Sequence, residues 1–132
     1  MKAVDTNVLV RLLTGDDLKQ SVTAKSLFAM EQIWIAKTVL LEANWVLRSL
    51  YDFEEDAIID SFARLIGLEN IHVEDEPSIV AALSLTAHGV KLADAMHLSF
   101  RPPGATFVSF DRSLVSRAKR AGAVDIISVP ER

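Results

Sequence analysis

The sequence predicts an α/β fold with three layers, α/β/α, around a central, mostly parallel sheet of roughly five strands. Short apolar runs alternate along the chain with longer segments whose apolar residues recur every three or four positions. Such alternation is typical of parallel strands joined by helical crossovers that cover both faces of a sheet. The chain has 132 residues, of which 50% are hydrophobic, enough to bury one sizeable core. We therefore expect a single domain spanning residues 1–132.

The first half of the chain predicts two strands and three helices. Residues 2–4 form a short strand, and the helix after it ends at Gly15, which suits the left-handed conformation that often follows a helix. A second helix over residues 17–30 is expected to bury Leu18, Val22, Leu27 and Met30. Residues 33–36 form the second strand. Thr38 is the expected N-cap of a third helix that continues to about residue 50.

The second half continues the alternation. Three acidic residues at positions 54–56 stand in the first turn of a fourth helix, where the helix dipole favours negative charge, and Gly67 ends that helix. A strand over residues 71–73 precedes a helix that begins at Pro77 and runs to residue 88, and another helix covers residues 92–100. A Pro-Pro-Gly turn at positions 102–104 leads to a strand over residues 106–109, a helix over 112–121 and a last strand over 125–128.

Composition excludes several classes of protein. The chain has no cysteine, which rules out disulfide scaffolds and thiolate metal sites and favours a cytoplasmic location. No export signal and no apolar stretch of the ~20 residues needed to cross a bilayer is visible. The net charge of −4 argues against a protein that coats nucleic acid, so any such contact must be local. A basic segment beside Asp111 is one candidate, although it reads equally well as a solvated helix face: Arg112, Arg117, Lys119 and Arg120.

Four acidic residues stand out from the rest because of where the predicted elements place them. Asp5 and Asp111 directly follow short apolar runs that read as buried parallel strands, where open α/β sheets hold their ligands, while Glu42 and Asp94 fall within apolar helices. Each has a simpler reading: Asp5 and Asp111 as helix caps, Glu42 as a side chain that reaches solvent, and Asp94 as an ion-pair partner of Lys91. Together, however, four carboxylates near one edge suggest a divalent cation such as Mg²⁺ or Mn²⁺ and metal-assisted phosphate chemistry.

The remaining polar and aromatic residues offer no competing chemistry. The histidines are His72, His88 and His97. His97 lies one turn from Asp94, and we expect it to pack in the core or to support the site. The aromatic residues Phe28, Trp34, Trp45 and Phe62 read as core residues, because they fall among apolar neighbours at strand or helix spacing. Tyr51 and Phe53, between the third and fourth helices, are open to either a structural role or a partner surface.

At these positions the sequence resembles the PIN-domain nucleases, especially the VapC-like toxins of type II toxin–antitoxin pairs. The resemblance rests on four segments in order, which cover essentially the whole chain: Asp5-Thr6-Asn7-Val8-Leu9, Glu42, Asp94-Ala95-Met96-His97-Leu98 and Ser109-Phe110-Asp111. Met96 stands where the family often has leucine, a change that conserves volume.

The resemblance implies a Mg²⁺- or Mn²⁺-dependent endoribonuclease whose metal ligands and catalytic residues are Asp5, Glu42, Asp94 and Asp111. It also implies that Thr6, Asn7 and Ser109 orient ligands or substrate, and Arg112 is a possible contact to the RNA backbone. A homodimer and an antitoxin with a basic inhibitory segment are the expected partners. The alternative is a catalytically weak PIN-like module that binds RNA or protein; an α/β phosphohydrolase with Asp5 as nucleophile is less favoured, because position 7 is asparagine where such enzymes need a second aspartate.

Overall fold

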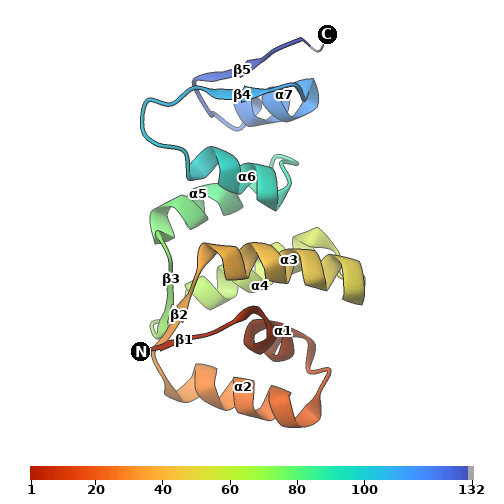
Figure 1. Cartoon of the computed structure of the whole chain (residues 1–132), viewed down its shortest axis with the longest axis vertical. Coiled ribbons are helices and arrows are strands. Elements are labelled where there is room, and N and C mark those ends of the chain that lie inside the picture. The colour runs from red at the N-terminus through yellow and green to blue at the C-terminus, as the bar shows by residue number, and fades with distance from the viewer. Residues whose placement is uncertain (131–132) are drawn as a thin grey trace. The chain divides into compact units, whose positions relative to one another are not determined.

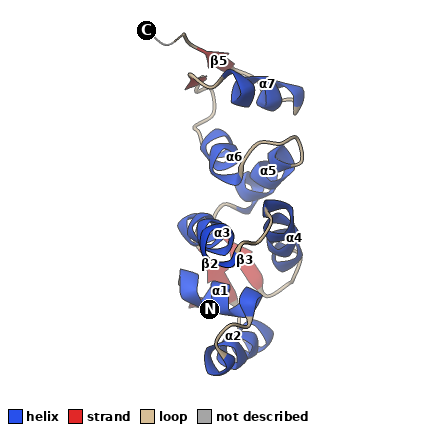
Figure 2. Cartoon of the chain, turned by 90° about the vertical axis from the view of Figure 1, so that its right-hand side faces the viewer, coloured by secondary structure: helices blue, strands red, loops and turns tan. Residues whose placement is uncertain are grey.

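The computed structural model describes residues 1–130 and contains seven helices and five strands over that range (Figure 1). Helices account for most of the described residues, and the strands are short (Figure 2). The chain divides into two compact units, Met1–Glu76 and Pro77–Arg132.

The first unit is built on a three-stranded parallel sheet. Its strands are β1 (Lys2–Ala3), β2 (Ile33–Ile35) and β3 (Ile71–Val73), in the order β1-β2-β3. Because neighbouring parallel strands require long crossovers, each pair is joined by two helices. These are α1 (Thr6–Thr14) and α2 (Leu18–Met30) between β1 and β2, and α3 (Lys37–Tyr51) and α4 (Glu55–Ile66) between β2 and β3.

The core of the first unit lies between β2, β3 and the helices. Ile33, Ile35 and Ile71 are almost fully buried, and so are Leu47 and Phe62 on α3 and α4. Helix α1 packs against both α2 and α3, and α3 contacts α4. Strand β1 has a neighbour on one side only and exposes both of its residues, so the predicted burial of this strand is wrong within its unit.

The second unit combines three helices with a two-stranded parallel sheet. It contains α5 (Glu76–Thr86), α6 (Leu92–Ser99), β4 (Phe107–Ser109), α7 (Arg112–Arg120) and β5 (Ile126–Ser128). Helix α7 is the crossover between β4 and β5 and contacts both strands. Arg101, just after α6, donates hydrogen bonds from its guanidinium to the carbonyl oxygens of Ala105 (3.2 Å), Val124 (2.7 Å) and Asp125 (2.9 Å). This arginine therefore ties the segments that precede β4 and β5 to the end of α6.

The predicted fold class is confirmed, since all five predicted strands are present, all their pairings are parallel, and helices connect them. The sheets are small, with three strands in one unit and two in the other. Gly15 ends α1 with φ 65°, as its position predicts. Thr38, in contrast, is not the N-cap of α3: the helix begins at Lys37, and Ala36 occupies the cap position without a side-chain hydrogen bond.

Helix α2 has the predicted length but not the predicted buried face. Leu18, Val22 and Met30 are exposed, whereas Ser21, Ala24 and Phe28 are buried. Small residues at positions 21 and 24 allow α2 to approach α1 closely, and the Ser21 hydroxyl is satisfied because it donates to the Arg11 carbonyl oxygen at 3.2 Å. The polar serine can therefore face inward while larger apolar side chains face solvent.

The aromatic residues divide between core and surface. Phe28 and Phe62 are buried, as predicted, and Trp34 is half-buried, but Trp45 is 58% exposed, so its assignment to the core is wrong. Tyr51 is half-buried, and its ring packs edge to face against the Phe53 ring, with 6.3 Å between the two ring centroids. The Tyr51 hydroxyl accepts from Arg11 Nη1 at 2.9 Å and donates to Asp16 Oδ2 at 2.7 Å. Tyr51 thus links α3 to the end of α1 inside the first unit.

Candidate functional site

Asp5 stands at the junction between β1 and α1. Its backbone is extended (φ −89°, ψ 177°), and its Oδ1 accepts the Val8 backbone N–H at 3.1 Å, which makes it the N-cap of α1. The capping role considered from the sequence is therefore real. The cap engages only Oδ1, since within residues 1–130 no hydrogen bond or ion pair engages Asp5 Oδ2. The side chain is exposed, so this second oxygen is accessible to a ligand.

Glu42 lies beside Asp5 in the first unit. The Thr6 hydroxyl donates a hydrogen bond to Glu42 Oε1, which connects the first turn of α1 to α3. Asp5, Thr6, Asn7 and Glu42 line one cavity of about 510 Å³. Two predicted ligands and two predicted orienting residues are thus brought together by the packing of α1 against α3. Because the Glu42 side chain is exposed, the expectation that it reaches solvent is also met.

Asp111 repeats the geometry of Asp5 in the second unit. It follows β4 and caps α7, with its Oδ1 accepting the Leu114 N–H at 3.0 Å. The Ser109 hydroxyl accepts the Asp111 backbone N–H at 3.0 Å and so holds the turn between strand and helix. As at Asp5, the cap uses one carboxylate oxygen, and no partner of Oδ2 is present in the described chain.

Asp94 is half-buried in α6 and faces the same small cavity as Asp111, a space of about 90 Å³. Among residues 1–130, no hydrogen bond or ion pair involves the Asp94 side chain, so the ion pair with Lys91 does not form. Lys91 nevertheless lines the cavity, as does Arg117, whose Nη1 donates to the Gly89 carbonyl oxygen at 3.2 Å. The second unit therefore places two carboxylates and two cationic side chains around one space.

Lys91 and Arg117 were missed as candidate site residues. The position of Lys91, three residues before Asp94 and at the N-cap of α6, was a usable signal, although the sequence suggested Lys91 only as a salt-bridge partner. No sequence signal placed Arg117 at the site apart from its membership of the basic segment, because its proximity to Gly89 and Asp94 depends on how α7 packs. Gly89 has φ +82°, a backbone conformation that favours glycine, whereas a Cβ there would make only an ordinary van der Waals contact with the Arg117 side chain at 3.6 Å.

Histidine takes no part in the two cavities that the carboxylates line. His97 is exposed, so its predicted place in the core is wrong. His72 lies in β3, where its Nε2 is 2.8 Å from Gln32 Oε1. The chemistry of these cavities consequently depends on carboxylate, hydroxyl, amide and cationic groups.

The donor set fits a hard divalent cation. Each unit contributes two of the predicted ligands, and within either unit the described residues bring no third Asp, Glu or His into a metal-binding group. All four carboxylates are oxygen donors, and at least one oxygen of each is left without a hydrogen-bond partner in residues 1–130. Mg²⁺ and Mn²⁺ prefer such oxygen ligands and often use only one or two carboxylates together with water and substrate phosphate.

An α/β fold that presents acidic residues at its strand ends and on adjoining helices defines a class of proteins suited to metal-assisted phosphate chemistry. Residues 2–120 match the family model of the PIN domain, and the chain belongs to that family. PIN domains are typically metal-dependent nucleases that use divalent cations. A comparison with curated proteins found no match. Within residues 1–130, no helix is long and apolar enough to cross a membrane.

Proposed function

We propose that this PIN domain is a metal-dependent endoribonuclease and the toxin of a VapC-like toxin–antitoxin pair. Its metal ligands and catalytic residues are Asp5, Glu42, Asp94 and Asp111, which hold Mg²⁺ or Mn²⁺. The observation that carries the proposal is the state of these carboxylates: two cap helices through one oxygen and keep the other unengaged, and Asp94 is half-buried with no partner in the described chain. A half-buried charge without a partner is costly unless a ligand compensates it.

The proposed reaction is hydrolysis of an RNA phosphodiester bond. A bound divalent cation would supply an activated water and would stabilise the charge on the leaving oxygen. Thr6 orients the Glu42 carboxylate through its hydroxyl, Asn7 offers an amide to substrate, and Ser109 holds the turn that carries Asp111. Arg112, exposed at the start of α7, contacts the RNA backbone.

The proposal extends to the organisation of the protein. We treat residues 1–132 as one domain, which is supported by a family match that spans residues from both units. The protein is proposed to form a homodimer, to act in the cytoplasm and to bind an antitoxin. An acidic site on a chain of net charge −4 attracts cationic groups, so the antitoxin should present a basic segment.

The alternative is a PIN-like module that binds RNA or protein without cleaving. A pure adaptor gains nothing from keeping like charges close to each other, and Asp94 and Asp111 line one cavity. Turnover distinguishes the two functions, because an adaptor would retain RNA intact in the presence of either metal.

RNA cleavage by the full chain tests the proposal directly. Cleavage of single-stranded RNA should require Mg²⁺ or Mn²⁺ and should stop when EDTA is added. Asp94→Asn should abolish cleavage and leave the circular dichroism spectrum unchanged, because asparagine has nearly the same volume. The matched control is Asp125→Asn, the same chemical change at an exposed residue of the same unit whose φ of 56° asparagine tolerates. Full cleavage in excess EDTA would contradict the metal mechanism, and so would an equal loss of cleavage in Asp94→Asn and Asp125→Asn.

A further inference from the structure

A second cavity in the first unit adjoins the metal site proposed above and shares Asp5 with it. It has a volume of about 460 Å³ and lies between α1 and α2. We call it the α1–α2 cavity, and its polar lining residues are Asp5, Asn7, Arg11, Lys19, Gln20 and Thr23. It shares Asp5 and Asn7 with the cavity that contains Glu42, so the two spaces lie on either side of the first turn of α1.

We propose that the α1–α2 cavity binds one nucleotide of a single-stranded RNA substrate, adjacent to the bond that is cut. The inference rests on the proposed function and extends it to the position and chemistry of a substrate-binding subsite. Its volume falls within the range of about 300–1,000 Å³ that is usual for small-molecule sites. Asp5 lines both cavities, so a nucleotide bound here would lie next to the proposed metal site.

The lining matches the parts of a nucleotide. Val8, Ala24 and Leu27 provide an apolar wall for the faces of a base. Lys19 is exposed and makes no ion pair within residues 1–130, so its charge is available to a phosphate. Because single strands expose base edges that duplexes hide, polar side chains beside an apolar wall favour an unpaired nucleotide.

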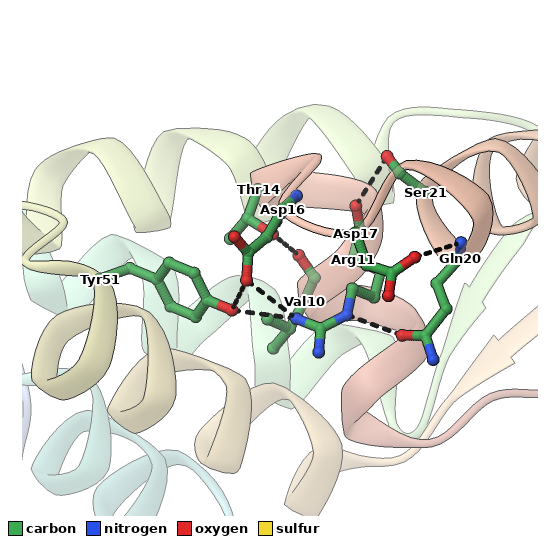
Figure 3. Close-up of polar contacts among 8 residues, drawn as sticks. All are labelled: Val10, Arg11, Thr14, Asp16, Asp17, Gln20, Ser21 and Tyr51. Atoms are coloured by element: carbon green, nitrogen blue, oxygen red, sulfur yellow. Dashed lines mark hydrogen bonds and ion pairs between the residues drawn. The ribbon is translucent and has the colours of Figure 1, made fainter.

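Gln20 is held in place by a network that crosses three helices (Figure 3). Arg11 Nε donates to Gln20 Oε1 at 2.7 Å, which engages the carbonyl of the carboxamide. Arg11 is in turn bonded to the Tyr51 hydroxyl at 2.9 Å and lies 3.5 Å from Asp16 Oδ2. In the described chain no acceptor engages Gln20 Nε2, so its two N–H donors remain for a base carbonyl, a ring nitrogen or a phosphate oxygen.

This network makes the subsite rigid before substrate binds. The Gln20 backbone N–H is also fixed, since it donates to the N-cap residue Asp17 at 3.0 Å. A side chain held by neighbours loses little conformational freedom on binding, which favours affinity and geometric selectivity. The same contacts would also hold α1 against α2 in a protein that binds no ligand here, so the substitutions chosen below change Lys19 and Thr23, whose side chains are not part of the Arg11–Gln20–Tyr51 network.

The test measures binding of a short fluorescein-labelled single-stranded RNA by anisotropy. Each variant is made in the full-length Asp94→Asn background with Mg²⁺, so that RNA is not cut. Lys19→Ala should weaken binding by about three- to tenfold and reduce the slope of log K against log salt by about 0.7, as expected for one lost phosphate contact on a single strand. Lys25→Ala removes the same charge from an exposed position of α2 outside the cavity, and it should change neither the affinity nor the slope by as much.

A second pair of variants tests the cavity by filling it. The Thr23→Phe ring should fill the space and exclude the base. RNA binding should then weaken by about tenfold or more, because the loss of one base-stacking contact typically lowers affinity by that amount. Ser26→Phe places the same ring on an exposed position of α2 that does not line the cavity and should bind as the parent does. Melting temperatures of both proteins separate a blocked subsite from a disturbed fold.

The outcomes of this test are distinguishable from those for the proposed function. If the wild-type chain cleaves RNA with metal but both cavity variants bind RNA as their controls do, the subsite assignment is wrong and the nuclease remains. If the chain neither binds nor cleaves RNA, both proposals fail. Weakened binding of a basic peptide but not of RNA in Thr23→Phe would mean that the cavity receives a protein segment, and it would overturn the nucleotide assignment.

Discussion

Asp5 and Asp111 occupy equivalent positions at the ends of strands in different units. Each caps the helix that follows through Oδ1, at 3.1 Å for Asp5 and 3.0 Å for Asp111. A carboxylate at the N-terminus of a helix is stabilised by the backbone N–H groups and the helix dipole, and because the cap uses one oxygen, the other is available to a ligand. One residue can therefore serve the local fold and the proposed metal site at once.

This double role predicts different results for two substitutions of Asp5. Asparagine is as good an N-cap as aspartate, so Asp5→Asn should keep the free energy of unfolding within a few tenths of a kcal/mol yet lose RNA cleavage. Asp5→Ala removes the cap as well and should cost about 1 kcal/mol in addition to activity. Urea denaturation and cleavage assays on both variants measure the two effects. Normal cleavage by Asp5→Asn would show that Asp5 is only a cap.

At the scale of the element, α2 shows how packing overrides an apolar pattern. Its buried positions, Ser21, Ala24 and Phe28, repeat every three or four residues, as a helical face should. The larger apolar residues Leu18, Val22 and Met30 lie on the other side. The far end of the helix is held by Asn70, whose Nδ2 donates to the carbonyl oxygens of Phe28 (2.6 Å) and Glu31 (2.8 Å). These bonds fix the rotation of α2 relative to β3.

The observed rotation of α2 predicts which truncations destabilise the protein. Phe28→Ala should lower the free energy of unfolding by about 3–5 kcal/mol, because it leaves a cavity at a site that is 6% exposed. Met30→Ala should change it by no more than about 0.5 kcal/mol, because that side chain is 80% exposed. Denaturant unfolding of the two variants gives the comparison. Equal losses, or a larger loss for Met30→Ala, would support the buried face that the sequence pattern indicated.

For the whole molecule, the proposed metal site should couple function to stability. Like-charged carboxylates near each other repel when no cation is bound, so function costs some stability. Asp94→Asn removes one charge from the cavity shared with Asp111. Lys91 and Arg117 line the same cavity and offset part of the repulsion, so in EDTA the variant should be more stable than the parent by no more than about 1 kcal/mol.

Adding Mg²⁺ or Mn²⁺ should reverse that order. The parent gains free energy from binding the cation, whereas the variant with its weaker site gains less. Melting curves of both proteins with EDTA and with metal measure the effect, and Asp125→Asn should show no metal-dependent change relative to the parent. A variant less stable than the parent in EDTA would mean that Asp94 has a structural role and does not belong to the metal site.

The antitoxin prediction also concerns the molecule as a whole. An arginine or lysine of the partner should enter the acidic site and take the place of the cation, which blocks substrate access. Replacing the basic residues of that segment by alanine should therefore restore RNA cleavage in the presence of the antitoxin. Full inhibition by an antitoxin without those residues would contradict the electrostatic account.

Local pattern predicted much of this protein correctly. Strand β3 has the predicted limits, α1 ends at Gly15, and the acidic first turn of α4 stands where residues 54–56 indicated. Family membership also followed from the order of the four acidic segments, and the match over residues 2–120 confirms it. The limits of the helices and strands depend on neighbours within about four positions, because helix and strand periods and helix caps are local properties.

Tertiary packing decided the features that no local pattern contains. Sequence alone did not indicate that Ser21 rather than Val22 faces α1, that Trp45 is exposed, or that His97 lies outside the core. It also did not indicate that Lys91 and Arg117 share a cavity with Asp94, or that Arg11 binds Tyr51 from 40 positions away. Such contacts join residues far apart in the chain, and their formation depends on how whole helices fit together: small residues permit close approach, and each buried polar group must find a partner.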